Sequence, residues 1–493
     1  MTIHGKPAFR VRQVLLTYIL IGGSIALMLL IVDSFSLFLK SLWSIPIYRE
    51  VKRLREKVQP NVMSNVNLES RKVAVLIPAR NAEPYIKHVL RSVVSQTLPP
   101  KIIVVLDDCS TDNTSTAAKS FIESIGAETR GTYRQGVDHY EYHFQSSGAS
   151  IRIFIVRFSS RMGKARALNA ALQEFCHGVD YVLVLDSDTM IEKCYLAKIV
   201  GRMESEPSVA AASGRIRLWN PSRKKGLGLL FVRAFRNLNF QSYSLLLKRT
   251  ESIHGALIYV NGCCAVYKYE KLMEVGGFPT DTVSEDTAVT LELIMHGAKA
   301  AFYPEALALT ADEPSIILLS KRMFRWAKGS YQNLIMRFKR MMATRARAIL
   351  ATVLYSYLGG LTFVIDLMDI PLSFWLYKYG FSGAGLLFKI AYAFHLSWLS
   401  AAAGFMSSNP ILALSITYLM GVAGMLLLNI YLIVLYRDRK IGGEIRQGII
   451  YTPIGAVLVW WQSILCLAAF INVIVESAYN RFRLRLTALQ LTP

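Results

Sequence analysis

The chain has 493 residues, of which 53% are hydrophobic and only 18% are charged. Soluble domains carry about 25% charged residues, so this composition argues against an entirely soluble chain and excludes a mainly disordered one. The excess of 56 lysines and arginines over 34 acidic residues gives a net charge of +22, which suits nucleic acid, anionic lipid headgroups or phosphorylated ligands. Six cysteines without Cys-x-x-Cys spacing predict neither a zinc site nor a disulfide framework.

Residues 1–58 are predicted to form a membrane anchor followed by a basic linker. Val14–Val32 contains no charged residue, and about 20 apolar residues span a bilayer. A cleaved signal peptide has an apolar core of only about 7–15 residues, so an uncleaved anchor is favoured. Six basic residues follow between Lys40 and Lys57, whereas only three precede the anchor. This asymmetry places the chain after Phe38 in the cytoplasm.

Residues 59–345 are predicted to form an α/β domain. Short β-branched runs alternate with helical stretches, which is typical of a mostly parallel sheet. The clearest strand candidates are Val73–Ile77, Ile102–Leu106, Ile153–Val156 and Tyr181–Leu185. Polar residues follow these runs, and open α/β sheets bind ligands at that edge. The stretch Gly126–Ile151 is longer than a usual connection and is interpreted as a surface insertion of unknown role.

Residues 346–493 are predicted to form a multi-helix membrane domain. Its apolar segments are Ile349–Ile365, Gly383–Gly404, Pro410–Tyr436 and Ile449–Val475. If all four segments span, the basic residues between positions 437 and 446 lie outside, against the positive-inside rule. The alternative is that one of the four segments lies in the membrane interface instead of spanning. The sequence leaves three and four spans open.

Acidic residues crowd the end of the second predicted strand, within Val104–Thr114. Like charges this close cost energy unless cations or hydrogen-bond donors are nearby. A residue of Ser110–Asp112 is placed to cap the following helix. Asp107 and Asp108 are predicted to contact a ligand.

The segment Arg161–Asn169 places Gly163 directly before a helix start. A glycine there lets backbone donors approach a phosphate, and Lys164 adds a positive charge. A solvated basic turn is the alternative explanation.

Asp186 and Asp188 follow the apolar run Tyr181–Leu185. Alternate residues of an extended chain share a face, so the two carboxylates are expected to point the same way. Carboxylate oxygens with open water positions suit Mg²⁺ or Mn²⁺ that carries a diphosphate. A divalent metal site is therefore predicted at Asp186 and Asp188.

The segment Val283–Thr287 opens a predicted helix. Ser284 is placed as the N-cap, and Glu285 and Asp286 complement the helix dipole, which explains both acids without catalysis. The functional interpretation makes Asp286 a general base poised over the ligand.

Lys321–Gly329 precedes the predicted membrane domain. Arg322, Arg325 and Trp326 share one helical face. Guanidinium groups bind phosphate oxygens through two parallel hydrogen bonds, and an indole face stacks on a sugar. A basic helix at the membrane surface is the alternative.

Taken in order, these segments resemble the membrane-bound family 2 glycosyltransferases, which include hyaluronan, chitin and cellulose synthases and ceramide glucosyltransferases. The resemblance in motifs runs from about residue 72 to about residue 332. Beyond that, the chain resembles the family only in having further apolar membrane segments. Val275–Phe278 before the acidic pair and Tyr303-Pro304 after it add to the ordered motifs. The resemblance implies a GT-A fold, a divalent metal and inverting transfer from a nucleotide sugar, by family default a uridine diphosphate sugar.

The resemblance also implies a role for each motif. The residues implied in donor binding are Pro78, Arg80, Asn81, Glu83, Asp107, Asp108, Lys164, Asp186 and Arg322. The implied metal ligands are Asp186 and Asp188. The implied catalytic residues are Asp286 as the base, Arg325 at the leaving diphosphate and Trp326 at the floor of the acceptor site. The implied acceptor side also includes Glu285, Cys263 and Cys264, the last two from the stretch Asn261–Cys264.

One position departs from the processive members of the family. They usually read Gln-x-x-Arg-Trp, and Arg322 stands at the Gln position, as in ceramide-glucosyltransferase-like members. The predicted product is a growing extracellular polysaccharide, favoured by the large membrane block, or a single sugar on a membrane lipid, favoured by Arg322. Membrane lipids are expected partners. Nucleic acid is not, because the chain has no basic stripe interleaved with aromatic residues.

Overall fold

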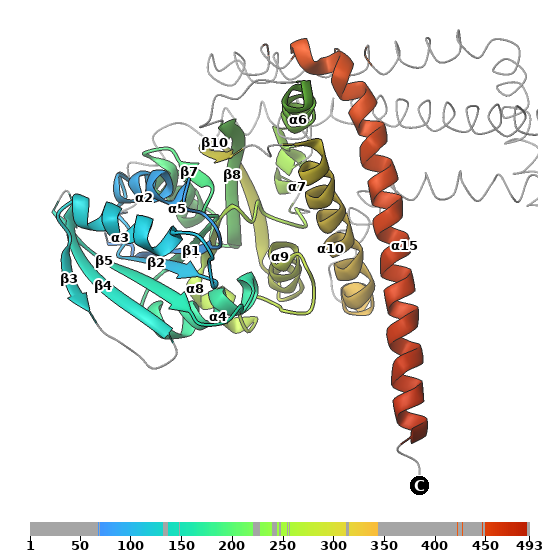
Figure 1. Cartoon of the computed structure of the whole chain (residues 1–493), viewed down its shortest axis with the longest axis horizontal. Helices are drawn as coiled ribbons and strands as arrows, with labels where there is room; N and C mark the ends of the chain where they lie inside the picture. Colours follow the sequence, from blue (N-terminus) through green and yellow to red (C-terminus); the bar gives the residue numbers. More distant parts are fainter. Residues whose placement is uncertain are drawn as a thin grey trace, which may run out of the picture. The chain divides into compact units, whose positions relative to one another are not determined.

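The computed structural model (Figure 1) describes residues 68–343 and 449–490, together with the single residues 422, 426 and 446. Within the first range it leaves out residues 69, 132–136, 147, 220–226, 239–243, 246–247, 254, 256 and 312–314. The chain divides into two compact units: Met1–Pro46 with Ser356–Leu467, and Ile47–Tyr355 with Ala468–Pro493. The predicted domain limits at residues 58, 345 and 346 stay predictions.

A ten-stranded sheet forms the centre of the larger unit, with the order β3-β4-β5-β2-β1-β6-β9-β8-β10-β7. The strands are β1 Val73–Ala79, β2 Ile102–Asp107, β3 Glu128–Gly131, β4 Val137–Ser146, β5 Ala149–Phe158, β6 Tyr181–Leu185, β7 Thr189–Ile191, β8 Val209–Trp219, β9 Cys264–Lys268 and β10 Lys299–Ala311. Neighbouring strands in the central run β5-β2-β1-β6 pair in parallel, and β8 is parallel to β10. The prediction of an α/β domain with a mostly parallel central sheet is confirmed, and all four strand candidates lie in it.

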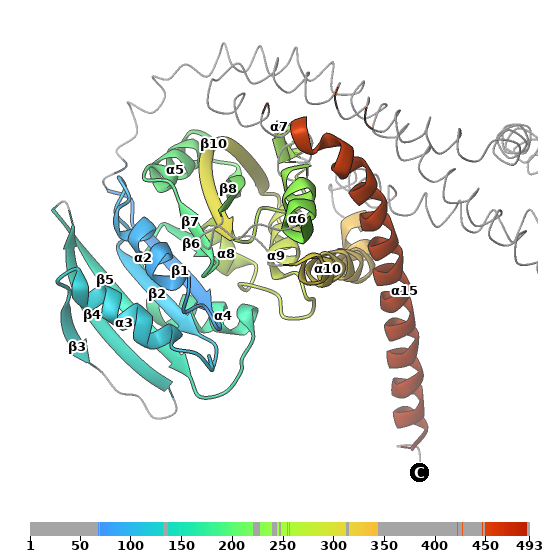
Figure 2. The ribbon, with the colours of Figure 1, turned by 45° about the horizontal axis from the view of Figure 1, so that its top comes forward.

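Helices cover both faces of the sheet. On one face, α2 (Ile86–Val94), α3 (Thr114–Ser124) and α5 (Tyr195–Ser205) bury apolar residues against the odd positions of β1, such as Val73 and Val75. On the other, α4 (Lys164–Phe175), α8 (Tyr269–Glu274) and α9 (Glu285–Met295) pack over Ala74 and Leu76. Because both faces are covered, β1 and β2 are buried apolar runs, as expected of parallel strands. Figure 2 shows these layers from a second direction.

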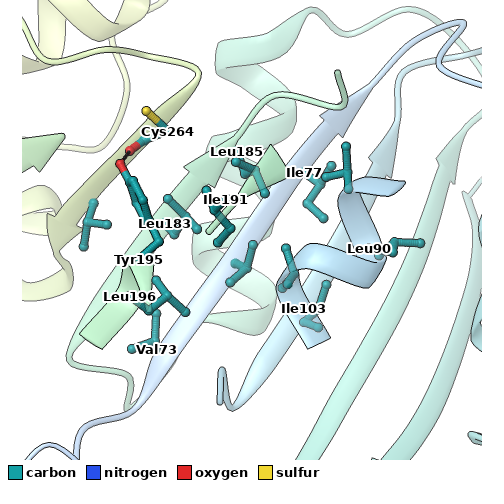
Figure 3. Close-up of a cluster of buried hydrophobic side chains, with 14 of the residues drawn as sticks. Val73, Ile77, Leu90, Ile103, Leu183, Leu185, Ile191, Tyr195, Leu196 and Cys264 are labelled. Carbon is teal, nitrogen blue, oxygen red and sulfur yellow. Dashed lines mark hydrogen bonds between the residues drawn. The ribbon is translucent and has the colours of Figure 1, made fainter. Parts of the chain in front are cut away.

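A buried tyrosine hydroxyl fastens α5 to two strands beneath the candidate site. Tyr195 points toward Cys264 in Figure 3, and its hydroxyl donates to the Cys264 carbonyl oxygen at 2.6 Å. The Tyr195 hydroxyl oxygen in turn accepts the Gly214 N–H at 2.9 Å. Since Cys264 begins β9 and Gly214 lies in β8, one side chain fixes both strands relative to the helix.

The predicted insertion Gly126–Ile151 extends the sheet. Its residues form β3, β4 and the start of β5, which pair antiparallel to one another at the sheet edge. Tyr142 is buried, and the Lys119 ammonium lies 3.2 Å from the centre of the Tyr140 ring. The expectation of a surface insertion is therefore refined to an added ribbon of strands.

In the described part of the chain, the remaining helices are α6 (Leu227–Leu238), α7 (Arg249–Ile253), α10 (Ile316–Ala343) and α15 (Thr452–Gln490), the last preceded by the short helix η3 (Ile449–Tyr451). In the larger unit, α10 lies beside part of α15 (Figure 1). Lys328 pairs with Glu476, and the Tyr331 and Phe470 rings lie 5.2 Å apart.

Most of the predicted membrane segments lie outside the described residues, single positions aside. The exception, Ile449–Val475, falls in η3 and α15. Among the described residues, no helix is both long enough and apolar enough to cross a bilayer. A membrane span at Ile449–Val475 is therefore not confirmed.

Candidate active site

The loops that follow β1 and β2 are tied together by the side chains of Asn81 and Glu83. Asn81 has a φ of 53°, and its N–H donates to Ser110 Oγ at 3.0 Å. Its side-chain oxygen accepts the Thr111 N–H at 2.9 Å, and Glu83 Oε2 accepts the Asn113 N–H at 3.0 Å. Asn81 and Glu83 therefore join two neighbouring strand ends at this edge of the sheet. Pro78 and Arg80 lie at the same edge, with Arg80 exposed.

Asp107 and Asp108 are both buried at the end of β2. Asp107 accepts the Ser110 N–H at 2.8 Å and the Ser115 hydroxyl proton, so its carboxylate holds the start of α3. The prediction that Asp107 contacts the donor is corrected, because its side chain is only 1% exposed and its oxygens are occupied. Asp108 accepts backbone N–H groups of Met162 and Gly163 at 2.6 and 3.0 Å. It thereby fixes the segment before α4, and its contact with the donor base stays a prediction.

Lys164 connects three parts of the site. As predicted, Gly163 precedes the first turn of α4, with a φ of 84° that favours glycine. The Lys164 ammonium lies 2.7 Å from Asp186 Oδ1, 2.9 Å from Glu285 Oε1 and 3.4 Å from the Gly262 carbonyl oxygen. Burial alone would lower the pKa of Lys164, but Asp186 and Glu285 outweigh it and hold the pKa well above its ordinary value. Lys164 is therefore a permanent cation at this position.

Asp186 and Asp188 follow β6, although not on an extended chain as predicted. The strand ends at Leu185, and residues 187–188 form a turn closed by the Thr189 N–H donating to the Asp186 carbonyl oxygen at 3.0 Å. Both side chains are partly exposed, and an Arg322 guanidinium nitrogen lies 3.8 Å from Asp188 Oδ2. The turn keeps the two carboxylates near the same strand end.

The donor set at this turn fits a hard divalent cation that shares its ligands with the donor. Within the described part of the chain, no three His, Cys, Asp or Glu residues converge as a metal cage. Asp186 and Asp188 would hold Mg²⁺ or Mn²⁺, which take oxygen ligands, and the ion when bound would supply positive charge to a diphosphate. The residues present therefore suit a metal that arrives with a diphosphate better than a resident structural ion.

Asp286 lies in the first turn of α9, and its environment raises its basicity. Ser284 precedes the helix as predicted, but its side chain makes no capping hydrogen bond. Asp286 Oδ1 accepts the Thr287 N–H at 2.7 Å. Burial, and then the neighbouring Glu285, raise the pKa of Asp286, while Lys164 opposes them. A carboxylate with a raised pKa is a better proton acceptor, which suits the predicted base.

The acceptor-side stretch Asn261–Cys264 faces Asp286 through its glycine. A Cβ built on Gly262 would overlap the Asp286 carboxylate, at 2.8 Å from its Cγ. Cys263 is half-buried, with its sulfur 4.0 Å from that of Cys264. Cys264 is fully buried in the core, so the prediction that its side chain touches the acceptor is corrected.

The three predicted residues of α10 lie on its N-terminal half. Arg325 and Trp326 are exposed, and Arg322 is half-buried beside Asp188. The buried Arg236 of α6 stacks 5.4 Å from the centre of the Trp326 ring, which orients the indole. Arg325 is close enough to Glu285 to lower the pKa of that carboxyl, after Lys164. The structure thus brings Arg322 and Arg325 to the carboxylates of β6 and α9.

Sequence reasoning missed Lys248. This lysine is 2% exposed, and its ammonium donates to Asn261 Oδ1 and lies 3.7 Å from the centre of the Tyr259 ring. Burial lowers the pKa of Lys248 to about 8, against the opposing influence of Glu251 and Asp286. No motif surrounds Lys248 in the sequence, so only the fold could place it behind the acceptor-side stretch.

Comparison with known families decides the class of this site. The profile described as Glycosyl transferase family group 2 matches residues 181–464, more than half of the chain, and that described as Glycosyl transferase family 2 matches residues 74–276. The chain belongs to glycosyltransferase family 2. It is accordingly an enzyme of the glycosyltransferase class, with a GT-A-like α/β fold.

Curated relatives are similar over part of their length. The poly-β-1,6-N-acetyl-D-glucosamine synthase of Staphylococcus epidermidis is 24% identical over 292 residues, which is 59% of this chain and 62% of that protein. The enzyme of the same name from Staphylococcus aureus strain COL is 24% identical over 273 residues, 55% of this chain and 58% of that protein. The chain thus matches less than two thirds of the length of these relatives.

Among solved structures, a mannosyltransferase from Pyrobaculum calidifontis in complex with GDP-Man and Mn²⁺ is 20% identical. The alignment covers 79% of this chain and 99% of that one, with a TM-score of 0.48.

Proposed function

We propose that this chain is an inverting hexosyltransferase that moves a sugar from a nucleotide-sugar donor, a uridine diphosphate sugar, to a growing extracellular polysaccharide. The observation that carries the proposal is the position of Lys164 between Asp186 and Glu285, 2.7 and 2.9 Å away. It joins the donor-side carboxylates to the helix of the proposed base. The names of the staphylococcal relatives make N-acetylglucosamine the first sugar to test.

The reaction is one in-line displacement. The acceptor hydroxyl oxygen forms a bond to the anomeric carbon as the bond from that carbon to the diphosphate breaks, which inverts the anomeric centre. The hydroxyl proton passes to Asp286, whose raised pKa suits a base. Negative charge develops on the leaving diphosphate, where Lys164, Arg322 and Arg325 are placed to stabilise it.

A divalent metal is part of the proposal. Asp186 and Asp188 would hold Mg²⁺ or Mn²⁺, which when bound supplies positive charge to the diphosphate. Cys263 and Trp326 are proposed to border the acceptor, because Cys263 follows the glycine that lies against Asp286, Trp326 follows Arg325, and both are at least partly exposed.

We propose a membrane setting with the active site in the cytoplasm. The uncharged segments at 14–32 and 410–436 are each long enough to span a bilayer, and the basic residues between 40 and 57 favour the cytoplasmic side. A transferase at the inner face would have donor at hand and would deliver product to or across the membrane. Membrane lipids are therefore proposed partners, and nucleic acid is not.

Transfer of a single sugar to a membrane lipid is the second candidate. Arg322 favours it, because the processive members that the sequence resembles carry an uncharged Gln at this position. Both candidates use the same displacement, and they differ in what accepts the sugar.

A product-partition assay separates the two candidates. The purified full chain in lipid would receive labelled nucleotide sugars, UDP-N-acetylglucosamine first, with Mn²⁺ or Mg²⁺. Label in a long water-soluble chain supports polysaccharide synthesis. Label in the organic phase at one sugar per lipid supports the second candidate and overturns the first. No transfer from any donor overturns both.

A further inference from the structure

Both carboxylates proposed to hold the metal are already paired with cations. The Lys164 ammonium lies 2.7 Å from Asp186 Oδ1, and an Arg322 guanidinium nitrogen lies 3.8 Å from Asp188 Oδ2. Each of the two carboxylates at the turn after β6 therefore already has a cationic side chain beside it. A divalent ion that approaches this turn without a nucleotide gains little binding free energy, because each carboxylate already has a counter-charge.

The two cations come from elements other than the strand that carries the aspartates. Lys164 begins α4, and Arg322 lies in the second turn of α10. Each side chain is about 30% exposed, so neither is enclosed in the core. Long flexible side chains of this kind can change partner without movement of the backbone.

We propose that Arg322, together with Lys164, neutralises the metal-binding aspartates until a nucleoside diphosphate enters, and then transfers to its phosphate oxygens. The metal and the nucleotide consequently bind together rather than one after the other. This inference rests on the proposed function, since it assigns an order of events to the same site. Arg322 is the discriminating residue, because Lys164 is also held by Glu285.

The exchange has a thermodynamic consequence. The diphosphate offers new anionic partners to the displaced cations. It therefore lowers the free energy needed to separate these cations from the aspartates. Metal and nucleotide then strengthen each other's binding, by the same factor in both directions. An uncharged residue at position 322 would not compete with the metal for Asp188, and would weaken this coupling.

The test is a titration of the purified full chain with Mn²⁺, in which free Mn²⁺ is measured by electron paramagnetic resonance, with and without saturating UDP. For the wild type we expect weak binding of Mn²⁺ alone and tightening by about 5- to 150-fold with UDP. Arg322→Gln should tighten the binding of Mn²⁺ alone by about two- to five-fold, the range expected of a partly exposed ion pair. The ratio between the two conditions should fall at least as much.

Two further variants make the result specific. Lys321→Gln removes the same charge from the neighbouring exposed position of α10 and should leave both affinities within about two-fold of wild type, as expected of a screened surface charge. Arg322→Lys keeps the charge and should keep the binding of Mn²⁺ alone as weak as in the wild type.

The outcomes separate the two claims. Unchanged affinity for Mn²⁺ alone in folded Arg322→Gln overturns this inference, as does an equal effect of Lys321→Gln. Those results leave the proposed function intact if the wild type still binds Mn²⁺ with UDP and transfers sugar. Failure of the wild type to bind Mn²⁺ with UDP overturns both.

Discussion

Gly329 of α10 lies directly against Ser284, the residue that precedes α9. A Cβ built on Gly329 would overlap the Ser284 hydroxyl and come 2.6 Å from its Cβ. One turn further along α10, the Asn333 side-chain NH₂ donates to the Ser284 carbonyl oxygen at 3.3 Å and to the Gly329 carbonyl oxygen at 2.9 Å. The helix of the arginines is thus fixed against the start of the helix of the base.

Gly329→Ala should therefore separate the two helices. Alanine would normally favour a helix interior by about 0.5–1 kcal/mol relative to glycine. Here the added methyl group has no room, so we expect a loss of about 1–3 kcal/mol in unfolding free energy, as for overpacked sites. Turnover should fall as Arg325 moves away from the start of α9, where it lies near Glu285. Denaturant unfolding and steady-state kinetics measure the two effects.

Gly228 of α6 gives the matched control. Among the described residues, nothing lies within 4 Å of a Cβ built there, so Gly228→Ala should be neutral or slightly stabilising. Ser284→Gly removes the atoms that the new methyl group meets. The double variant Gly329→Ala with Ser284→Gly should recover most of the stability, and additive losses would show that the contact is not the cause.

Asp286→Asn should retain donor binding and lose transfer by about 10²–10⁴-fold if Asp286 is the base. In the wild type, transfer should fall as the pH drops through the raised pKa of Asp286, because the protonated carboxyl accepts no proton. A pH–rate profile whose acid limb lies at the ordinary aspartate value of about 3.9 would contradict this environment.

The same shift predicts a stability gain for Asp286→Asn at neutral pH. The folded-state pKa is raised, so below the unfolded-state pKa both states are protonated and the carboxyl carries no charge penalty. The penalty develops as the pH rises through the folded-state pKa. The variant should consequently melt above wild type at neutral pH and equal to it in acid; a lower melting temperature at neutral pH would be inconsistent.

Lys164→Gln should weaken donor binding about ten- to hundredfold, the range for loss of a charged hydrogen bond. The pKa of Lys164 is held well above its ordinary value, so its charge does not change at neutral to mildly alkaline pH. The effect should therefore be independent of pH there. Arg166→Gln on the same helix removes one exposed charge and is the control. Equal losses in both variants would assign the effect to net charge.

An ion cluster around the buried Arg337–Glu292 pair, further along α10 than Gly329, should hold α10 in place. Glu292 of α9 accepts from Arg337 at 3.0 Å and from Arg340 at 2.7 Å, and Arg337 also pairs with Asp281 at 3.0 Å. Arg337 is 4% exposed, and loss of one partner of a buried pair costs about 3–5 kcal/mol.

Glu292→Gln should accordingly lower the unfolding free energy by several kcal/mol. The exposed pair of Lys271 with Glu274 is the comparison, and Glu274→Gln should cost about 1 kcal/mol or less. Thermal or urea unfolding of both variants distinguishes them. Similar small losses would mean that the Glu292 cluster does not stabilise the contact between α9 and α10.

The sequence alone predicted those strands that are continuous apolar runs and those helices whose first residue follows a recognisable glycine or serine. The four apolar runs predicted the central strands, and Gly163 and Ser284 marked helix starts at the observed positions. Asp286 and Arg325 were predicted near one ligand, and the structure brings Glu285, the neighbour of Asp286, close to Arg325.

Errors arose where local pattern and tertiary packing differ. Asp107 belongs to a motif, yet burial commits its oxygens to the start of α3. Cys264 points into the core because β9 alternates sides, a register that depends on β6 and β8. The close approaches of Gly262 and Gly329 involve residues far away in the chain, and no local pattern records them.

The most direct measurement is sugar transfer by the purified full chain, wild type beside Asp286→Asn, with labelled UDP-N-acetylglucosamine and Mn²⁺ in lipid. We expect the wild type to release UDP and to place label on an acceptor with inverted anomeric configuration, and we expect Asp286→Asn to bind the donor but to transfer almost none. Transfer by Asp286→Asn at the wild-type rate, or no transfer by wild type from any nucleotide sugar, would contradict the proposed mechanism.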